Sequence, residues 1–356
     1  MFLVNKPVIS AIISIRNCEA YIAECLASLE AQTFKDFEVV VVLDAPTDRT
    51  PEIVESFQGR LDIKILRNEK QMGKPWNLNR AWAAARGEFI AQIDGDDLFP
   101  PRKFEIQLAY MRWRPELGFT GTMGRYFGTK EGKITIPRSR LNCRFWIFWC
   151  ASPFLHSSAM FRRETFLKAG VRYCEEIPYP EDFRLFADAV YTGIKFANIG
   201  ADLYHWRQHA SNWETQDRAR HESLTRANQK HILATLGLPA TDAGLALHHG
   251  IAGMNVPDTP EAINASLDWL VKIASCEYGK LGISRRAMSF MLRLRWAVVV
   301  FKNCVRRRSP NRRLYFGRVE GFNPLVIWRV PLWIATRLSV LRPHEETRLC
   351  FKSLKK

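Results

Sequence analysis

The stretch Gly87-Glu88-Phe89-Ile90-Ala91-Gln92-Ile93-Asp94-Gly95-Asp96-Asp97 joins a strand-like run to three carboxylates within four residues. Three such charges repel one another, so a fold that holds them together normally offers them a cation. Closely spaced hard oxygen ligands suit Mg²⁺ or Mn²⁺, which also bind phosphates. The alternative is a solvated Asp-Gly turn that leads into a helix with Asp96 or Asp97 as its N-cap. The surrounding sequence bears on this choice.

Strand and helix signals alternate through the first hundred residues. Runs of buried-strand type occupy 8–15, 37–43, 63–66 and 88–93, and helical patterns occupy 19–32, 50–58 and 75–85. Such alternation predicts an α/β fold with a mostly parallel sheet flanked by helices. Ligands of these sheets bind beyond the carboxyl ends of the strands. Asn17, Asp44 and the acids of 94–97 follow strand ends, so we expect them on one rim of the sheet.

The pattern becomes mixed beyond residue 100. Helices are expected over 102–113, 181–191, 211–236 and 259–274, and strands over 118–127, 133–136 and 194–199. A chain of 356 residues with 47% hydrophobic residues can fill a substantial core, either as one large domain with an extension or as two domains.

The cysteines and the apolar runs bear on location. The eight cysteines form no C-x-x-C pair and no zinc-type spacing with histidine, which is typical of reduced thiols in a cytosolic protein. No apolar run reaches the roughly 18–20 residues of a spanning helix. The apolar run at 8–15 is too short for a signal peptide. We therefore expect a cytoplasmic protein.

Positive charge is concentrated at the C-terminal end. Residues 285–356 hold 18 Lys and Arg against three acidic residues, whereas the rest of the chain is nearly neutral. Apolar runs at 296–301 and 325–328 lie between the basic residues. This mixture predicts helices on an anionic membrane surface, with apolar side chains entering the interface. Nucleic acid is not expected as a partner, because it would not require so many apolar residues.

Six short motifs, taken together and in order, resemble those of the family 2 glycosyltransferases, an inverting group with the GT-A fold. The resemblance covers roughly residues 7–215. The motifs are Ser14-Ile15-Arg16-Asn17; Gln32-Thr33-Phe34-Lys35-Asp36-Phe37-Glu38; Leu43-Asp44-Ala45-Pro46-Thr47-Asp48-Arg49-Thr50; Gly73, Asn79 and Ala85-Arg86-Gly87-Glu88 leading into Asp94-Gly95-Asp96-Asp97; Pro180-Glu181-Asp182-Phe183; and Trp206-Arg207-Gln208-His209. Two departures stand out: Ser14-Ile15-Arg16 replaces the usual Pro and Tyr, and Leu43 replaces the first Asp of the third motif.

The resemblance implies a GT-A nucleotide-sugar-binding and catalytic domain at 1–215. The helical pattern and the charge beyond it predict a helical extension at 216–284 and a basic, apolar tail at 285–356. The resemblance also implies Mg²⁺ or Mn²⁺ as cofactor, held by Asp96 and His209. Asp94 either lies nearer the ribose or shares the metal, and Asp97 either completes the metal site or caps the next helix. Asp182 would be the general base, with Glu181 the less favoured candidate. The nucleotide-sugar site would comprise Ser14, Asn17, Glu19, Asp44, Lys74, Asn79, Asp94 and Arg207, with Asp44 favouring a UDP-type donor.

Each of these residues also has a structural interpretation. Asp182 is a favourable acid at a helix N-terminus, Asp44 a turn residue, and Arg207 a surface ion-pair partner. Ser14, Asn17 and Glu19 would be strand ends or helix caps, Lys74 a solvated lysine and His209 a structural histidine. His156 and the aromatic run 145–149 either bind the acceptor or pack in the core.

The sequence therefore predicts an inverting transfer of a sugar from a nucleotide-sugar to a glycan or lipid-linked acceptor. The expected site of action is the inner face of the cytoplasmic membrane, in the synthesis of cell-surface polysaccharide or lipopolysaccharide. One alternative is a sugar-phosphate nucleotidyltransferase, although the Gly-rich basic loop after the first strand is absent. The other is a non-catalytic, membrane-associated nucleotide-binding protein. Residues 71–75 have no P-loop pattern, which disfavours ATP hydrolysis.

Overall fold

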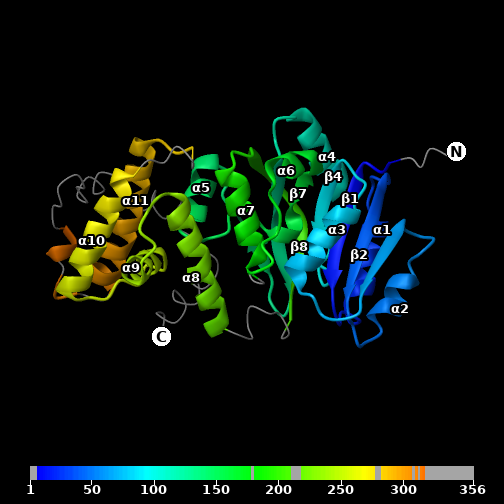
Figure 1. Ribbon diagram of the computed structural model, residues 1–356, viewed down its shortest axis with the longest axis horizontal. Helices are drawn as coiled ribbons and strands as arrows, with labels where there is room; N and C mark the ends of the chain where they lie inside the picture. The colour runs from blue at the N-terminus through cyan, green and yellow to red at the C-terminus, as the bar shows by residue number, and fades with distance from the viewer. Residues whose placement is uncertain are drawn as a thin grey trace. The chain divides into compact units, whose positions relative to one another are not determined.

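The computed structural model describes residues 6–177, 180–209, 218–276, 282–306, 309–311 and 313–316 (Figure 1). The chain divides into two compact units. The first comprises residues 1–140 and 154–221, and the second comprises 141–153 and 222–356. The predicted functional division at 215 and 284 stays a prediction.

A mixed sheet forms the centre of the first unit. Its order is β3-β2-β1-β4-β7-β5-β6, and β8 pairs with β5. The pairs β1–β2, β1–β4, β2–β3 and β5–β8 are parallel, whereas β7 runs antiparallel to β4 and β5, and β6 antiparallel to β5. The strands are β1 (Ile9–Ile15), β2 (Phe37–Asp44), β3 (Ile63–Asn68), β4 (Phe89–Ile93), β5 (Phe119–Gly128), β6 (Gly132–Ile134), β7 (Met160–Arg162) and β8 (Phe196–Gln208). The predicted mostly parallel α/β sheet is confirmed.

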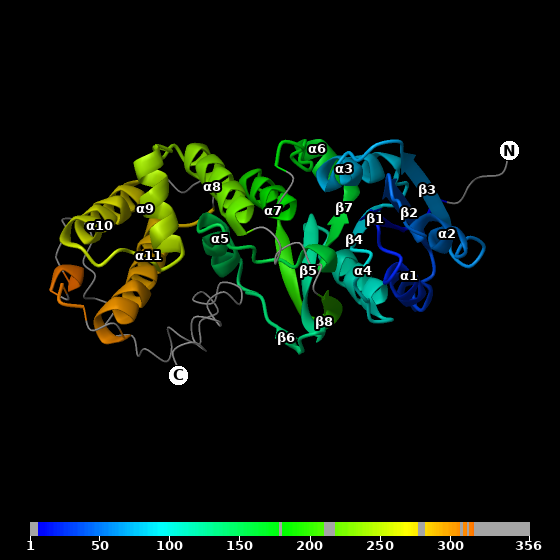
Figure 2. The same cartoon turned by 90° about the horizontal axis from the view of Figure 1, so that it is seen from below.

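Helices cover both faces of this sheet because its central strands are apolar on both sides. Every residue of β2 is buried. Buried side chains of α1 and α4 share one core cluster with alternate residues of the strands, and α3 lies on the opposite face (Figure 2). The helices are α1 (Ile22–Glu30), α2 (Thr50–Glu55), α3 (Lys74–Ala84), α4 (Lys103–Trp113), α6 (Arg163–Ala169) and α7 (Glu181–Tyr191), with a 3₁₀ turn η1 (His156–Ser158).

The second unit is helical in its described part. Its helices are α5 (Arg140–Phe148), α8 (Arg218–Thr235), α9 (Asp242–Ala252), α10 (Pro260–Ser275) and α11 (Arg285–Val300), followed by η4 (Phe301–Arg306) and η5 (Leu314–Phe316). The first residue of α5 and the first turn of α8 belong to the first unit. Thr241, Thr259 and Ser284 cap α9, α10 and α11 by accepting a hydrogen bond from a backbone N–H. The aromatic run 145–149 is mostly buried here, as expected of core packing.

Most of the apolar residues of α11 are buried, although Phe290 is exposed. Met288, Leu292, Trp296 and Val299 are fully buried. The expectation that the run 296–301 enters a membrane interface is therefore wrong for Trp296 and Val299, because burial within the protein already removes them from water. The run 325–328 lies outside the described residues. Among the helices that the structure describes, none is both long and apolar enough to cross a membrane.

Candidate active site

The loops that follow β1 and β2 are joined at the rim of the sheet. Asn17, in the left-handed region with φ 35°, accepts a hydrogen bond from the backbone N–H of Thr47 at 2.8 Å. Glu19 accepts one from the backbone N–H of Arg49 at 3.0 Å. Ser14 lies half-buried near the end of β1. The structure therefore places these three predicted residues at one edge, as parallel strands require.

Asp44, the last residue of β2, is 4% exposed, and its carboxylate accepts hydrogen bonds from other residues of the protein. Its Oδ1 accepts hydrogen bonds from Asn68 Nδ2 and Met72 N, both at 2.8 Å, and its Oδ2 accepts one from Gly73 N at 3.0 Å. Burial opposes ionisation, but these donors hold the pKa of Asp44 below its ordinary value. Asp44 thus fastens the segment that leads into α3, a contact that the sequence did not predict.

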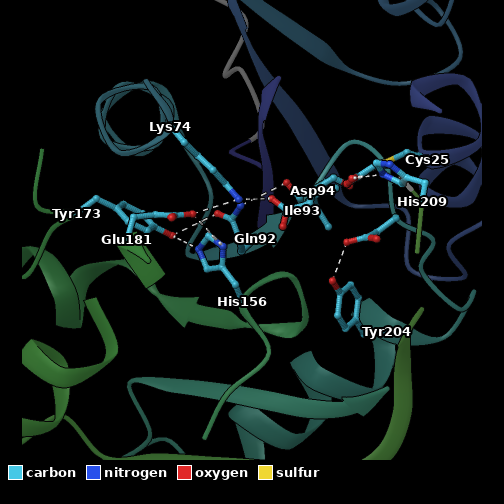
Figure 3. Close-up of polar contacts among 12 residues, drawn as sticks. Cys25, Lys74, Gln92, Ile93, Asp94, His156, Tyr173, Glu181, Tyr204 and His209 are labelled. Carbon is cyan, nitrogen blue, oxygen red and sulfur yellow. Dashed lines mark hydrogen bonds and ion pairs between the residues drawn. The ribbon is translucent and has the colours of Figure 1, made fainter. Parts of the chain in front are cut away.

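Lys74, the first residue of α3, lies between two acids from distant parts of the chain. Its Nζ is 3.0 Å from Asp94 Oδ1 and 3.1 Å from Glu181 Oε1 (Figure 3). Burial disfavours the charged amine, yet Asp94 and Glu181 raise the pKa of Lys74 well above its ordinary value. Burial likewise opposes ionisation of Asp94, but Lys74 lowers the pKa of that carboxyl to about 2. Lys74 and Asp94 are therefore both charged at neutral pH.

His156 and Tyr173 complete this group, which we call the lysine cluster (Lys74, Asp94, His156, Tyr173 and Glu181). His156 Nδ1 is 3.9 Å from Glu181 Oε1, and His156 Nε2 is 2.8 Å from the Tyr173 hydroxyl. Burial and the nearby Lys74 lower the pKa of His156 to about 4, so its imidazole is neutral at pH 7. His156, considered from the sequence as an acceptor-binding residue, is here a buried neighbour of Glu181.

Asn79, predicted to bind the nucleotide, instead holds the segment before α7. Its Oδ1 accepts a hydrogen bond from Tyr173 N, and its Nδ2 donates to Tyr173 O, both at 3.0 Å. The Tyr173 hydroxyl donates to Gln92 Oε1 at 3.3 Å. The oxygen and the nitrogen of the Asn79 amide thus both form hydrogen bonds within the protein. The sequence motifs did not predict a role for Tyr173 or Gln92.

Asp97, three residues beyond Asp94, is 1% exposed. It accepts hydrogen bonds from the Tyr204 hydroxyl at 2.6 Å and from Arg207 N at 2.8 Å. Burial, followed by the charges of Asp96 and Asp94, raises the pKa of Asp97 well above its ordinary value. Asp97 therefore does not cap the next helix, whose N-cap is Arg102. Both of its carboxylate oxygens accept hydrogen bonds from β8.

Arg207, predicted to contact the diphosphate, is held by protein groups. Its Nε donates to Asp96 O at 2.7 Å, and its Nη2 is 2.8 Å from Glu24 Oε2. Its guanidinium carbon is 5.0 Å from the ring centroid of Tyr21 and 4.5 Å from that of Phe127. These contacts use the planar, charged guanidinium to tie β8 to the loop after β4 and to α1.

Asp96 and His209, predicted as metal ligands, lie next to each other. His209 Nε2 is 3.1 Å from Asp96 Oδ2, and its ring stacks on Tyr21 with centroids 4.6 Å apart. With Asp97, Tyr204 and Arg207, these two residues form what we call the aspartate cluster. A carboxylate beside an imidazole is a donor pair that fits Mn²⁺, and Mg²⁺ or Mn²⁺ takes its other ligands from phosphates and water. Within the described part of the chain, no group of three or more acidic, His or Cys side chains is arranged to hold a metal.

Asp182 is the second residue of α7, directly after Glu181. Its side chain is half-buried, and its Oδ1 accepts a hydrogen bond from Phe183 N at 2.7 Å. Glu181 is 3% exposed and points to Lys74. The two predicted catalytic acids therefore differ in environment, and the less buried one is Asp182.

Comparisons with known proteins agree with this architecture. The model of glycosyl transferase family 2 matches residues 10–169. The putative glycosyltransferase EpsE of Bacillus subtilis is 28% identical over 252 residues, which is 67% of this chain and 86% of that protein. The amylovoran biosynthesis glycosyltransferase AmsE of Erwinia amylovora is 30% identical over 195 residues, 53% of this chain and 72% of AmsE.

A solved structure shares the fold. TarS 1–349 of S. aureus, in complex with UDP-GlcNAc, superposes with a TM-score of 0.57 at 19% identity, covering 85% of this chain and 92% of that one. The predicted GT-A type of fold with C-terminal helices is thereby confirmed. On the combined match to the family model and to AmsE, the chain belongs to glycosyl transferase family 2 and is a glycosyltransferase.

Proposed function

We propose that this glycosyltransferase moves a sugar from a nucleotide-sugar, with inversion, to a glycan or lipid-linked acceptor, and that Asp182 is the general base. One observation carries the proposal: Lys74 contacts both Asp94, at the end of β4, and Glu181, the neighbour of Asp182. This contact supports a position of the base candidate near the rim where parallel strands end and ligands bind. An inverting reaction needs a base on the acceptor hydroxyl, opposite the leaving group.

The donor is proposed to be of the UDP type. TarS, whose structure contains UDP-GlcNAc, supports a nucleotide-sugar donor on this fold. Ser14, Asn17 and Glu19 would line the nucleotide side of the rim, with Asp44 shaping it through the segment at 69–73. The name of AmsE, an amylovoran biosynthesis enzyme, supports a polysaccharide-type acceptor. The sugar-phosphate nucleotidyltransferase and non-catalytic alternatives find no support in these relatives.

Mg²⁺ or Mn²⁺ would be held by Asp96 and His209. When bound, the ion would neutralise charge on the diphosphate leaving group. Asp94, whose Oδ1 pairs with Lys74, fits the ribose side better than a shared metal position. Asp182 would take the proton of the acceptor hydroxyl, and Arg207 would hold the loop that carries Asp96.

The test compares Asp182→Asn and Asp96→Ala with the wild-type chain in Mn²⁺, using a panel of UDP-sugars. Transfer and donor hydrolysis are measured separately. Asp182→Asn should lose transfer by about 10²–10⁴-fold, the range of general base catalysis, while still binding UDP. Near-normal transfer by this variant would remove Asp182 from the mechanism.

We also propose that the protein acts at the inner face of the cytoplasmic membrane. The excess of basic over acidic residues in 285–356 supports an anionic surface as partner. The full chain should sediment with vesicles containing phosphatidylglycerol and be released as salt rises. Equal binding to neutral vesicles, or preferential binding to an oligonucleotide, would contradict this assignment.

A further inference from the structure

Lys74 occupies an unusual position for a lysine. It is the first residue of α3, where the positive end of the helix dipole disfavours a cation. Pro75 follows it, and Gly73 precedes it at φ 89°. The backbone N–H groups of Met72 and Gly73 are both bound to Asp44. The stem of Lys74 therefore starts from backbone fixed on both sides, and two acids offset the unfavourable helix end.

The other end of the contact is a buried carboxylate. Glu181 begins α7 with 3% of its surface exposed. Besides Lys74, His156 lies close to this carboxylate, with its Nδ1 3.9 Å from Oε1. That imidazole is itself buried and bound to Tyr173. A buried carboxylate in such surroundings depends on a cation, because an unpaired buried charge is strongly destabilising. Lys74 supplies this cation.

The same ammonium fixes Asp94. Asp94 Oδ1 and Glu181 Oε1 contact one Nζ at 3.0 and 3.1 Å, so a single group joins the end of β4 to the first turn of α7 (Figure 3). Without Lys74, two carboxylates would face each other and repel. The first turn of α7 also carries Asp182.

We propose that Lys74 is a positioning residue for the transfer step: its ammonium bridges Asp94 and Glu181 and so sets the place of Asp182 relative to the donor. Glu181 is then the anchor of the bridge and not a base. This inference rests on the proposed role of Asp182. It differs from the sequence-based prediction that Lys74 belongs to the nucleotide-sugar site. Small displacements of a reacting group lower the rate strongly, so the expected effect falls on kcat.

The test uses Lys74→Met, Glu181→Gln, the double variant and Lys74→Arg, with Lys168→Met as a control at an exposed lysine that pairs with Glu164 on α6. For each, kcat, donor KM, UDP affinity by calorimetry and the thermal midpoint are measured. Lys74→Met and Glu181→Gln should each lower kcat by about 10–100-fold with donor KM changed less than about threefold. The double variant should be no worse than the poorer single variant, because both break one bridge. Lys74→Arg should recover part of kcat.

A rise of more than about tenfold in donor KM and UDP dissociation constant for Lys74→Met, with kcat retained, would make Lys74 a phosphate ligand and overturn the bridge. Normal kcat in Glu181→Gln would overturn it too. Should Lys74→Met fail to fold, Glu181→Gln decides, since it keeps the size of the side chain and removes only the negative charge that pairs with Lys74. Asp182→Asn is assayed in parallel: full transfer by that variant refutes the base assignment, whereas the kcat and KM pattern of Lys74→Met and Glu181→Gln judges the bridge.

Discussion

The lysine cluster and the aspartate cluster both contain acids of the stretch 94–97, but the two surroundings shift the pKa of these acids in opposite directions. Asp94 turns to Lys74, which lowers its pKa to about 2. Asp97 is buried against β8, where it accepts hydrogen bonds from Tyr204 and Arg207, and burial and its acidic neighbours raise its pKa. One cluster keeps charges ionised through a cation, and the other holds a carboxyl whose neutral form is favoured. The surroundings, and not the motif, decide what each acid does.

The largest expected effect is on the aspartate cluster. Asp97→Ala removes the acceptor for the Tyr204 hydroxyl and the Arg207 N–H, two buried donors. We expect a loss of about 3 kcal/mol in the free energy of unfolding, measured by urea denaturation. Asp97→Asn keeps an acceptor and matches a neutral carboxyl, so it should lose less than about 1 kcal/mol. Equal losses in both variants would mean that the negative charge of Asp97 is what matters.

Metal binding should separate the clusters next. His209→Ala removes a proposed ligand beside Asp96, whereas Glu181→Gln leaves that pair intact. In the presence of UDP, His209→Ala should weaken Mn²⁺ binding about 10–100-fold, measured by Mn²⁺ titration of the thermal midpoint. Glu181→Gln should leave the Mn²⁺ dependence unchanged. A loss in both variants, or in Glu181→Gln alone, would place the ion at the lysine cluster.

The pH dependence of stability should also differ between the clusters. The folded-state pKa of Asp94 lies below its ordinary value of 3.8, so its ionised form stabilises the fold above about pH 4. This contribution, about 2 kcal/mol, is lost as the pH falls toward 2. Asp94→Asn should therefore destabilise the protein at pH 7 and less so at pH 3. Asp97 has a raised pKa, so Asp97→Asn should become more stable relative to wild type as the pH rises above 4. Parallel pH curves for the two variants would contradict the comparison.

The sequence predicted the strand ends well and the partners poorly. The residue periodicity and the apolar runs of the sequence located β1, β2 and β4, because a buried parallel strand has a local sequence signature. The ends of these strands in turn located the rim with Asn17, Asp44 and Asp96. The bridge from Lys74 to Glu181 joins residues more than a hundred positions apart, and no local pattern encodes it. Arg207 and Asn79 carry motif resemblance, yet their contacts are set by Glu24, Phe127 and Tyr173, which belong to no motif.

The same limit applies to the basic segment. Its charge and its apolar runs were visible in the sequence, but helical periodicity cannot distinguish a face that packs on another helix from one that enters a membrane. Trp296 and Val299 of α11 are buried against protein. The membrane prediction therefore depends on its charge and on residues beyond 316.

The smallest expected effect belongs to Tyr204→Phe. This change removes one hydroxyl, 2.6 Å from Asp97, and leaves the ring that stacks on Phe99. We expect a loss of about 1 kcal/mol in the free energy of unfolding, the ordinary value of one hydrogen bond. Asp97 keeps the bond from Arg207 N, so β8 should stay in place and kcat should change less than about threefold. In the double variant with Asp97→Asn, the two losses should not add, because both act on one contact. Additive losses would show that Tyr204 and Asp97 act independently, and that the aspartate cluster is not one hydrogen-bonded unit.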